Sequence, residues 1–323
     1  MSKAIRLHEH GGADKLVWED VEVPAPGPEE ALVRHTAIGL NFSDVYLRTG
    51  LYPRPLPSGV GTEAAGVVEA VGKKVKGLKK GDRVVYMFPV PGAYAEQRVL
   101  PSGALVKIPA GVKDDAAAAL LLKGLTTWYL LRETYKVKKG DTILILAAAG
   151  GVGLIMSQWA RALGAKVIGQ VSSEAKARLA KKAGCHQVLV GLDNLGERVK
   201  KLNKGKGVDV VYDGVGKDSF LASLDSLRPR GLMVSFGNAS GPVGAITPLE
   251  LAKRGSLYLT RAGGGDYLAD PAARKKGVAE LFNLIKKKKI KAHIGQRYAL
   301  ADAAKAQSDL EARATVGSTI LVP

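Results

Sequence analysis

The residues with the clearest chemical purpose lie in a glycine-rich turn, Ala148–Gly153. The turn follows the apolar segment Thr142–Ala148 and precedes Gly153–Leu163, whose apolar residues recur at helical spacing. Its pattern, Ala-x-Gly-x-x-Gly, matches the Gly-x-Gly-x-x-Gly fingerprint of dinucleotide sites with the first glycine replaced. In such a turn Gly150 would let the backbone approach a pyrophosphate, and Gly153 would allow close contact between helix and sheet. The pattern predicts a dinucleotide site, with a tight turn that binds nothing as the structural alternative.

The residues after the next apolar segment, Lys166–Val171, indicate which dinucleotide binds. NAD sites usually carry Asp or Glu at the end of this strand, about 20 residues after the turn. Here two hydroxyls, Ser172 and Ser173, and the cation Lys176 follow instead. These groups suit a 2′-phosphate, so the sequence favours NADP(H). Alternatively, the serines cap a helix, Lys176 is an exposed helix lysine, and Glu174 complements the helix dipole.

The spacing of apolar residues along the whole chain predicts the strands and helices that would position these residues. Residues 1 to about 123 form short alternating segments separated by Pro and Gly clusters, which is typical of a β barrel or sandwich. After that, strands alternate with helices, which predicts a parallel sheet covered by helices on both faces. The expected strands are Thr142–Ala148, Lys166–Val171, His186–Val190, Val208–Tyr212, Leu232–Phe236 and Ser256–Thr260. From about Gly265 the alternation ends, and this tail is expected to pack back on the first domain.

Composition excludes several classes of protein. The chain has 323 residues, of which 46% are hydrophobic and 24% charged, so it can form a packed core. A single cysteine, Cys185, excludes an internal disulfide and a cysteine-rich zinc site. The longest apolar run, Thr142–Met156, is shorter than the roughly 20 residues of a membrane span, and no signal peptide is evident. We therefore expect a soluble cytoplasmic protein.

The net charge of +18 is the unusual feature of the composition. A basic surface attracts nucleic acid, acidic lipid or phosphorylated cofactors. The lysines are scattered, however, and Lys286–Lys289 is their only dense run. A solvated basic face is therefore favoured over a dedicated nucleic-acid site.

Motifs along the whole chain resemble those of the medium-chain dehydrogenase/reductase superfamily, and specifically its zinc-independent quinone oxidoreductase branch, the ζ-crystallin-like enzymes. The resemblance rests on Gly39–Asp44, Gly50–Pro53, Gly61–Val68, Gly81–Val84, Gly124–Thr127, Ala148–Gly153, Val210–Gly216 and Ser235–Gly241. It implies an α/β protein in which a Rossmann doubly wound parallel sheet is inserted in a GroES-like β-barrel domain. The expected domains are residues 1–123 with 265–323 for the GroES-like part and 124–264 for the NADP(H)-binding part, with the active site in the cleft between them.

Zinc-dependent members of the superfamily carry a Cys in the first of these motifs and Gly-His-Glu in the third. This chain has Ser43 and Gly61–Glu63 in those places and lacks the four-cysteine lobe. The sequence therefore predicts no metal site. Without a Lewis acid to stabilise an alkoxide, interconversion of simple alcohols and aldehydes is not expected. A quinone is an easier hydride acceptor, because its carbonyls are conjugated and its reduced form is aromatic.

The resemblance also implies site residues. Asn41, Tyr46 and Tyr52 would line the cleft near the nicotinamide, where Asn41 could hydrogen-bond a quinone oxygen and the tyrosines could stack on its ring or donate to it. Structural roles in a turn, a helix and a loop are equally consistent with spacing alone. The cofactor contacts carried over are Thr127, Gly150, Gly151, Val152, Ser172, Ser173, Lys176, Phe236, Gly237, Asn238 and Arg313. Family members often have a tyrosine after the third Rossmann strand, where this chain has Gly191, which weakens the prediction of strict NADPH selectivity.

Three functions follow from these observations as hypotheses. The leading one is an NADPH-dependent quinone reductase that needs no metal. The second is a metal-free, NADPH-dependent enone or enoyl reductase, and the third, from a different class, is RNA binding, which some ζ-crystallin relatives show. The resemblance further implies a homo-oligomer, a dimer or tetramer, that makes contact through the Rossmann edge strand near Ser256–Thr260.

Overall fold

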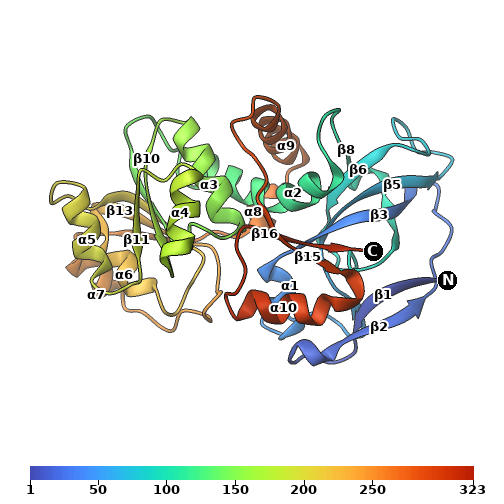
Figure 1. Ribbon diagram of the computed structural model, residues 1–323, viewed down its shortest axis with the longest axis horizontal. Helices are drawn as coiled ribbons and strands as arrows, with labels where there is room; N and C mark the ends of the chain where they lie inside the picture. Colours follow the sequence, from blue (N-terminus) through green and yellow to red (C-terminus); the bar gives the residue numbers. More distant parts are fainter. The chain divides into compact units, whose positions relative to one another are not determined.

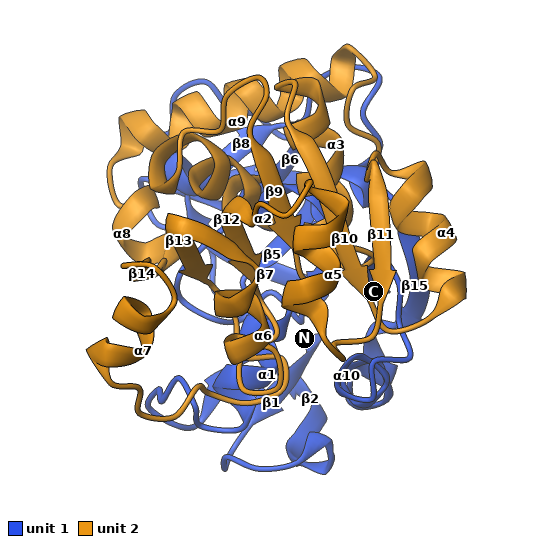
Figure 2. Ribbon diagram, turned by 90° about the vertical axis from the view of Figure 1, so that its left-hand side faces the viewer, with its two compact units in different colours: residues 1–122, 292–323 blue, residues 123–291 orange.

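Two units of the chain each build their own sheets in the computed structural model, which describes residues 1–323 (Figure 2). Unit 1 comprises Met1–Leu122 and Ala292–Pro323, and unit 2 comprises Lys123–Lys291. The chain therefore leaves the first unit once and returns to it, which is the insertion that the sequence predicts. None of its helices combines the length and the apolar character that crossing a bilayer requires.

Unit 1 is a mostly antiparallel β domain. Its three-stranded sheet has the order β2-β1-β4, and its seven-stranded sheet has the order β15-β16-β3-β5-β6-β8, with β7 paired to β3 (Figure 1). The strands are β1 (Ser2–Leu7), β2 (Leu16–Val21), β3 (Glu30–Leu40), β4 (Ser58–Gly59), β5 (Glu63–Val71), β6 (Arg83–Met87), β7 (Gln97–Pro101), β8 (Leu105–Lys107), β15 (Ile294–Ala299) and β16 (Ser318–Val322). The helices are α1 (Phe42–Arg48), the first part of α2 (Asp114–Tyr129) and α10 (Ala303–Glu311). The C-terminal strand β16 lies beside β3, so the returning tail completes the sheet.

The long strand β3 explains how unit 1 places its polar residues. It pairs antiparallel with β5 and β7, and its register against β5 shifts twice, between Leu32 and Val33 and between His35 and Ala37. Such irregularities bend a strand and re-aim its side chains. At its carboxyl end the strand runs through buried Ile38 and Leu40 directly into α1. The start of α1 is thereby anchored to the core of the sheet.

Unit 2 is a parallel sheet of six strands in the order β11-β10-β9-β12-β13-β14. All five pairings are parallel, and the order is that of the doubly wound dinucleotide-binding fold. The strands are β9 (Thr142–Ile145), β10 (Lys166–Val171), β11 (Gln187–Val190), β12 (Val208–Asp213), β13 (Leu227–Ser235) and β14 (Tyr258–Arg261). The helices are α3 (Gly151–Ala162), α4 (Glu174–Lys182), α5 (Leu195–Leu202), α6 (Phe220–Asp225), α7 (Pro248–Lys253), α8 (Gly264–Leu268) and α9 (Pro271–Lys286).

The segment 265–291 differs from the expectation, because it belongs to unit 2 rather than to the first domain. Helix α9 packs against the second half of α2, where a Cβ on Gly277 would lie 2.9 Å from both Leu125 and Trp128. Trp128 Nε1 also donates to Glu280 Oε2 at 3.0 Å. The return to unit 1 comes only at Ala292. The apolar stripe Val278, Leu281, Phe282 and Ile285 predicts an amphipathic helix over Val278–Lys287, but it does not specify the surface on which that helix packs.

Candidate active site

The glycine-rich turn joins β9 to α3 in unit 2. Ala147 has a positive φ of 50°, and Gly150 is the N-cap of α3 without a side-chain cap. A Cβ on Gly153 would lie 2.5 Å from Ala147 O and 2.7 Å from Ala148 Cα, which only glycine avoids. On Gly150 the nearest atom to a Cβ would be Ala147 O at 3.2 Å. Gly153 therefore serves the approach of helix to strand, while Gly150 lies at the more open end of the turn.

The amino end of α3 has the features of an anion site. The first N–H groups of a helix have no acceptors within the helix, and here no side chain caps them. The helix is 12 residues long, so its dipole places positive partial charge at this end. Gly151 and Val152, two predicted pyrophosphate contacts, lie in its first turn. This arrangement can bind a diphosphate through backbone N–H groups.

The predicted 2′-phosphate residues lie at the end of β10. Ser173 is the N-cap of α4, and its Oγ accepts a hydrogen bond from the backbone N–H of Lys176 at 3.4 Å. The capping role considered for this serine is thus present. Ser172 is exposed, Lys176 is half-buried, and Glu174 opens the helix. Ser172, Ser173 and Lys176 all lie within five residues after the end of β10, and no carboxylate stands at that strand end.

Gln170 connects the glycine-rich turn to two neighbouring strand ends, and sequence reasoning missed it. It is buried, with 6% of its surface exposed. Its Oε1 accepts from Ala147 N at 3.4 Å, and its Nε2 donates to Val171 O at 2.9 Å and Gly191 O at 3.3 Å. A polar residue within the apolar strand β10 is the sequence signal that could have revealed it. Around Gly191, which has a φ of 78°, no atom lies within 4 Å of an added Cβ, so the position of the family tyrosine is open space.

Asp213, at the end of β12, holds the loop that follows this strand. It is not among the site residues predicted from the sequence. Its Oδ1 accepts from Val215 N at 2.8 Å and Gly216 N at 3.1 Å, and its Oδ2 accepts from Ser219 Oγ and Ser223 Oγ, both at 2.7 Å. The carboxylate is 1% exposed. Four donors hold the loop after β12 in one conformation.

The predicted residues Phe236, Gly237 and Asn238 follow β13 and pack on that loop. Phe236 N donates to Asp213 O, and a Cβ on Gly237 would lie 2.4 Å from Gly214 O. The loops at the carboxyl ends of β12 and β13 are therefore in direct contact. In doubly wound sheets this edge is where ligands bind.

Thr127 belongs to the part of α2 that lies in unit 2. It is fully buried, and its Oγ1 has no hydrogen-bond partner. An unpaired buried hydroxyl costs about 1–3 kcal/mol. A cofactor with a polar group at this position would supply the missing partner.

The predicted substrate residues lie around α1 in unit 1. Tyr46 and Tyr52 make an edge-to-face contact, with ring centroids 5.2 Å apart and an interplanar angle of 72°, and Phe42 lies 6.0 Å from Tyr46. Tyr46 is 8% exposed and Tyr52 is 44% exposed. Arg313 also belongs to unit 1, just after α10, with a φ of 58°. The structure thus brings Tyr46 and Tyr52 into contact, and it places Asn41 at the N-cap of α1, the helix that contains Tyr46.

Asn41 caps α1 and is held by carboxylates. Its side chain accepts from the backbone N–H of Asp44, and its own N–H donates to Asp44 Oδ2 at 2.9 Å, a reciprocal capping box. Its Nδ2 donates to Glu63 Oε2 at 3.0 Å and to Gly39 O at 3.3 Å. Tyr94 donates its hydroxyl to Asp44 Oδ2 at 2.9 Å. Burial raises the pKa of the Tyr94 phenol well above its usual value, and the Asp44 carboxylate adds to the shift, so the phenol stays a donor.

No three His, Cys, Asp or Glu side chains gather so that they could hold a metal ion. His35, for example, is buried in unit 1, where its Nδ1 lies 2.7 Å from Ala95 O and its Nε2 lies 3.0 Å from the hydroxyl of Tyr86. The single cysteine, Cys185, is buried with its Sγ 3.3 Å from Ser157 Oγ.

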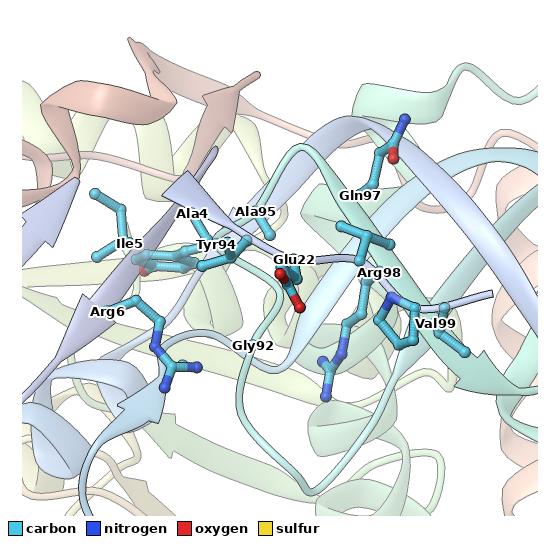
Figure 3. A pocket seen from close by; sticks show the side chains of 14 residues that line it. Ala4, Ile5, Arg6, Glu22, Gly92, Tyr94, Ala95, Gln97, Arg98 and Val99 are labelled. Carbon is cyan, nitrogen blue, oxygen red and sulfur yellow. The ribbon is translucent and has the colours of Figure 1, made fainter. Parts of the chain in front are cut away.

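Two cavities in the molecule contain none of the predicted site residues. One, of about 240 Å³, lies in unit 1 between β1, the end of β2 and the start of β7, with Arg6, Glu22 and Arg98 among its side chains (Figure 3). The other, of about 400 Å³, lies in unit 2 at the amino end of β9 and β10, the edge of the sheet opposite the glycine-rich turn. The candidate cofactor residues of unit 2 and the candidate substrate residues of unit 1 therefore lie outside both cavities.

Comparison with known proteins gives matches over both units. A family model described as "Alcohol dehydrogenase GroES-like domain" matches residues 27–110, and one described as "Zinc-binding dehydrogenase" matches residues 151–270. A quinone oxidoreductase of Pseudomonas aeruginosa is 51% identical over the full length of both chains. A 2-haloacrylate reductase of a Burkholderia species is 44% identical over 100% of this chain and 99% of that protein.

A solved structure agrees with these matches. The Escherichia coli quinone oxidoreductase, crystallised with NADPH, superimposes with a TM-score of 0.96 at 47% identity, covering 99% of this chain and 100% of that one. A GroES-like unit interrupted by a Rossmann unit defines the medium-chain dehydrogenase/reductase class. Within that class, the chain belongs to the quinone oxidoreductase family.

Proposed function

We propose that this protein is an NADPH-dependent quinone reductase that works without a bound metal. The observation that carries the proposal is the uncapped amino end of α3 at the glycine-rich turn, within a six-stranded parallel sheet of the dinucleotide-binding order. Full-length identity of 51% to a quinone oxidoreductase supports the choice of acceptor.

The residues of unit 2 fit the cofactor. The buried Thr127 hydroxyl lacks a partner, and the backbone at Gly150 is not covered by a side chain. Gly150, Gly151 and Val152 would hold the pyrophosphate, and Ser172, Ser173 and Lys176 the 2′-phosphate. Phe236, Gly237 and Asn238 would flank the nicotinamide half. Arg313, from unit 1, would provide a further cation for a phosphate.

When bound, NADPH supplies the hydride, which with one proton converts a quinone into a hydroquinone. The chain's own part is to hold and orient the acceptor. Tyr46 and Tyr52 would contact the quinone ring, and their edge-to-face packing limits their motion. The Nδ2 group of Asn41 makes two hydrogen bonds, and the bond to Gly39 O is longer than the bond to Glu63 Oε2. The hydrogen that now bonds Gly39 O would be donated to a quinone oxygen. That donor would stabilise the negative charge that grows on the oxygen as hydride arrives.

The test is oxidation of NADPH by the purified protein in the presence of several ortho- and para-quinones. We expect turnover with at least one quinone. A folded protein that binds NADPH and oxidises it with none of them would contradict the proposed acceptor.

A second candidate is reduction of an α,β-unsaturated carbonyl by the same residues. The 44% identity to a 2-haloacrylate reductase over the whole chain favours keeping it. Comparing kcat/KM for quinones with that for acrylates and enones distinguishes the two. We propose the quinone because the relatives with the higher identities carry that name.

We further propose a homodimer that works in the cytoplasm. The strand β14 is the last strand of the unit 2 sheet, and its Tyr258 and Leu259 are 62% and 39% exposed. A second copy pairing at this edge would cover both. A reducing compartment suits a chain whose one cysteine is unpaired. Nucleic acid is not proposed as a partner, because the lysines are scattered along the sequence and Lys286–Lys289 is their only dense run.

A further inference from the structure

Glu63 is a buried carboxylate that the predicted site does not include. It is the first residue of β5 and has no exposed surface. Its Oε1 accepts from the backbone N–H of Leu122, and its Oε2 accepts from Asn41 Nδ2 at 3.0 Å. The two oxygens of one side chain thus join a strand, the N-cap of α1 and the helix α2.

The backbone around Glu63 is shaped to receive this carboxylate. A Cβ on Gly39 would lie 2.3 Å from Glu63 Oε2 and 2.5 Å from Ala118 O. The backbone φ of Gly39 is not in the left-handed region, so the requirement for glycine here is one of space. Any larger residue at this position would displace the carboxylate from Asn41.

The contacts of Asn41 fix the orientation of its amide. Two acceptors, Glu63 Oε2 and Gly39 O, lie on the nitrogen side of the amide. A flipped amide would place its oxygen against a carboxylate, which is unfavourable. The second amide hydrogen is donated to Gly39 O over the longer distance of 3.3 Å. In the proposed complex this hydrogen is donated to a substrate oxygen instead.

We propose that Glu63 is a positioning residue for quinone reduction: it holds the Asn41 amide so that the nitrogen, and not the oxygen, is presented to the quinone. This inference rests on the proposed function. It adds that Glu63 acts on the transition state through Asn41, without contact to substrate or cofactor of its own.

The first test is Glu63→Gln, which keeps the shape of the side chain but replaces one acceptor oxygen with a donor NH₂. The amide of Asn41 can then turn its oxygen toward this new NH₂ group, and its nitrogen loses its anchor. We expect kcat for the quinone to fall by roughly 10- to 100-fold, as for a misplaced catalytic group, while the dissociation constant for NADPH is unchanged. Glu69→Gln, the same change at a partly exposed position of β5, is the control and is expected to keep wild-type kinetics.

The second test separates positioning from folding. In the double variant Asn41→Asp with Glu63→Gln, donor and acceptor exchange places, so the hydrogen bond between the two side chains is restored. We expect the Tm to recover toward the wild-type value while kcat stays low, because the carboxylate that replaces the Asn41 amide has no N–H to offer the quinone. The inference is overturned if Glu63→Gln retains wild-type kcat and KM, or if the exchanged pair regains wild-type kcat. A folded wild-type protein that reduces no quinone would instead overturn the proposed function.

Discussion

Lys176 is the side chain whose removal best separates the two nicotinamide cofactors. It lies in the first turn of α4, beside exposed Ser172. If it contacts the 2′-phosphate, Lys176→Ala removes one charge-assisted hydrogen bond, worth about 1.5–3 kcal/mol. We expect the dissociation constant for NADPH to rise by roughly 10- to 100-fold and that for NADH to change little, as measured by fluorescence titration. An equal loss for both cofactors would show that Lys176 does not touch the phosphate.

Single residues also mark where sequence reasoning stops. The motif identifies Gly150 and Gly153, because their function depends on backbone geometry that the local sequence encodes. It does not identify Gln170, Asp213 or Glu63, because each acts through partners elsewhere in the chain. Glu63, for example, meets Asn41 only after β3 and β5 have paired. Such residues become visible when the fold brings their partners together.

At the scale of elements, the β9–α3 turn supports a matched pair of substitutions. Gly153→Ala places a methyl group 2.5 Å from Ala147 O, and overpacking of this kind costs about 1–3 kcal/mol. Gly150→Val adds bulk at the open end of the turn, where the φ of −79° is accessible to any residue and only Ala147 O, at 3.2 Å, lies near the new Cβ. We expect Gly153→Ala to lower the Tm by several degrees and Gly150→Val to abolish NADPH binding with a smaller change in Tm.

Calorimetry and fluorescence titration of the two glycine variants check this division. If Gly150→Val bound NADPH as the wild type does, the pyrophosphate would not lie against this turn. If Gly153→Ala left the Tm unchanged, the close approach of α3 to β9 would not be as tight as the structure has it.

The elements of unit 2 could be predicted well from the sequence because short apolar runs alternate with helical segments; β9, for example, is buried throughout. The expected Lys166–Val171 is β10 to the residue, and the other five strands overlap their predicted ranges. The sequence predicts that residues 265–323 belong to the other domain, whereas α9 belongs to unit 2. An amphipathic stripe does not specify the surface on which a helix packs. Gly277, which lets α9 pack closely on α2, acquires its meaning only in the folded unit.

For the molecule as a whole, the buried His35 makes stability depend on pH. Burial lowers the pKa of His35 from 6.5 to about 4, so the folded state binds fewer protons than the unfolded state between these values. Stability from this source is fully present above about pH 6.5 and is lost as the pH falls toward 4, by about 3 kcal/mol in all.

Urea unfolding between about pH 4 and 7 measures this dependence. We expect the free energy of unfolding to rise with pH across that interval, and we expect His35→Gln to reduce the slope. A variant with the wild-type slope would assign the acid sensitivity to other groups.

The central claim is hydride transfer from NADPH to a quinone by a chain that needs no metal. The most direct measurement is the steady-state rate of NADPH oxidation with a panel of quinones, using protein that has been treated with a chelator and assayed for residual zinc. We predict undiminished turnover by the metal-free protein. Loss of activity on chelation and its return with stoichiometric zinc would contradict the account.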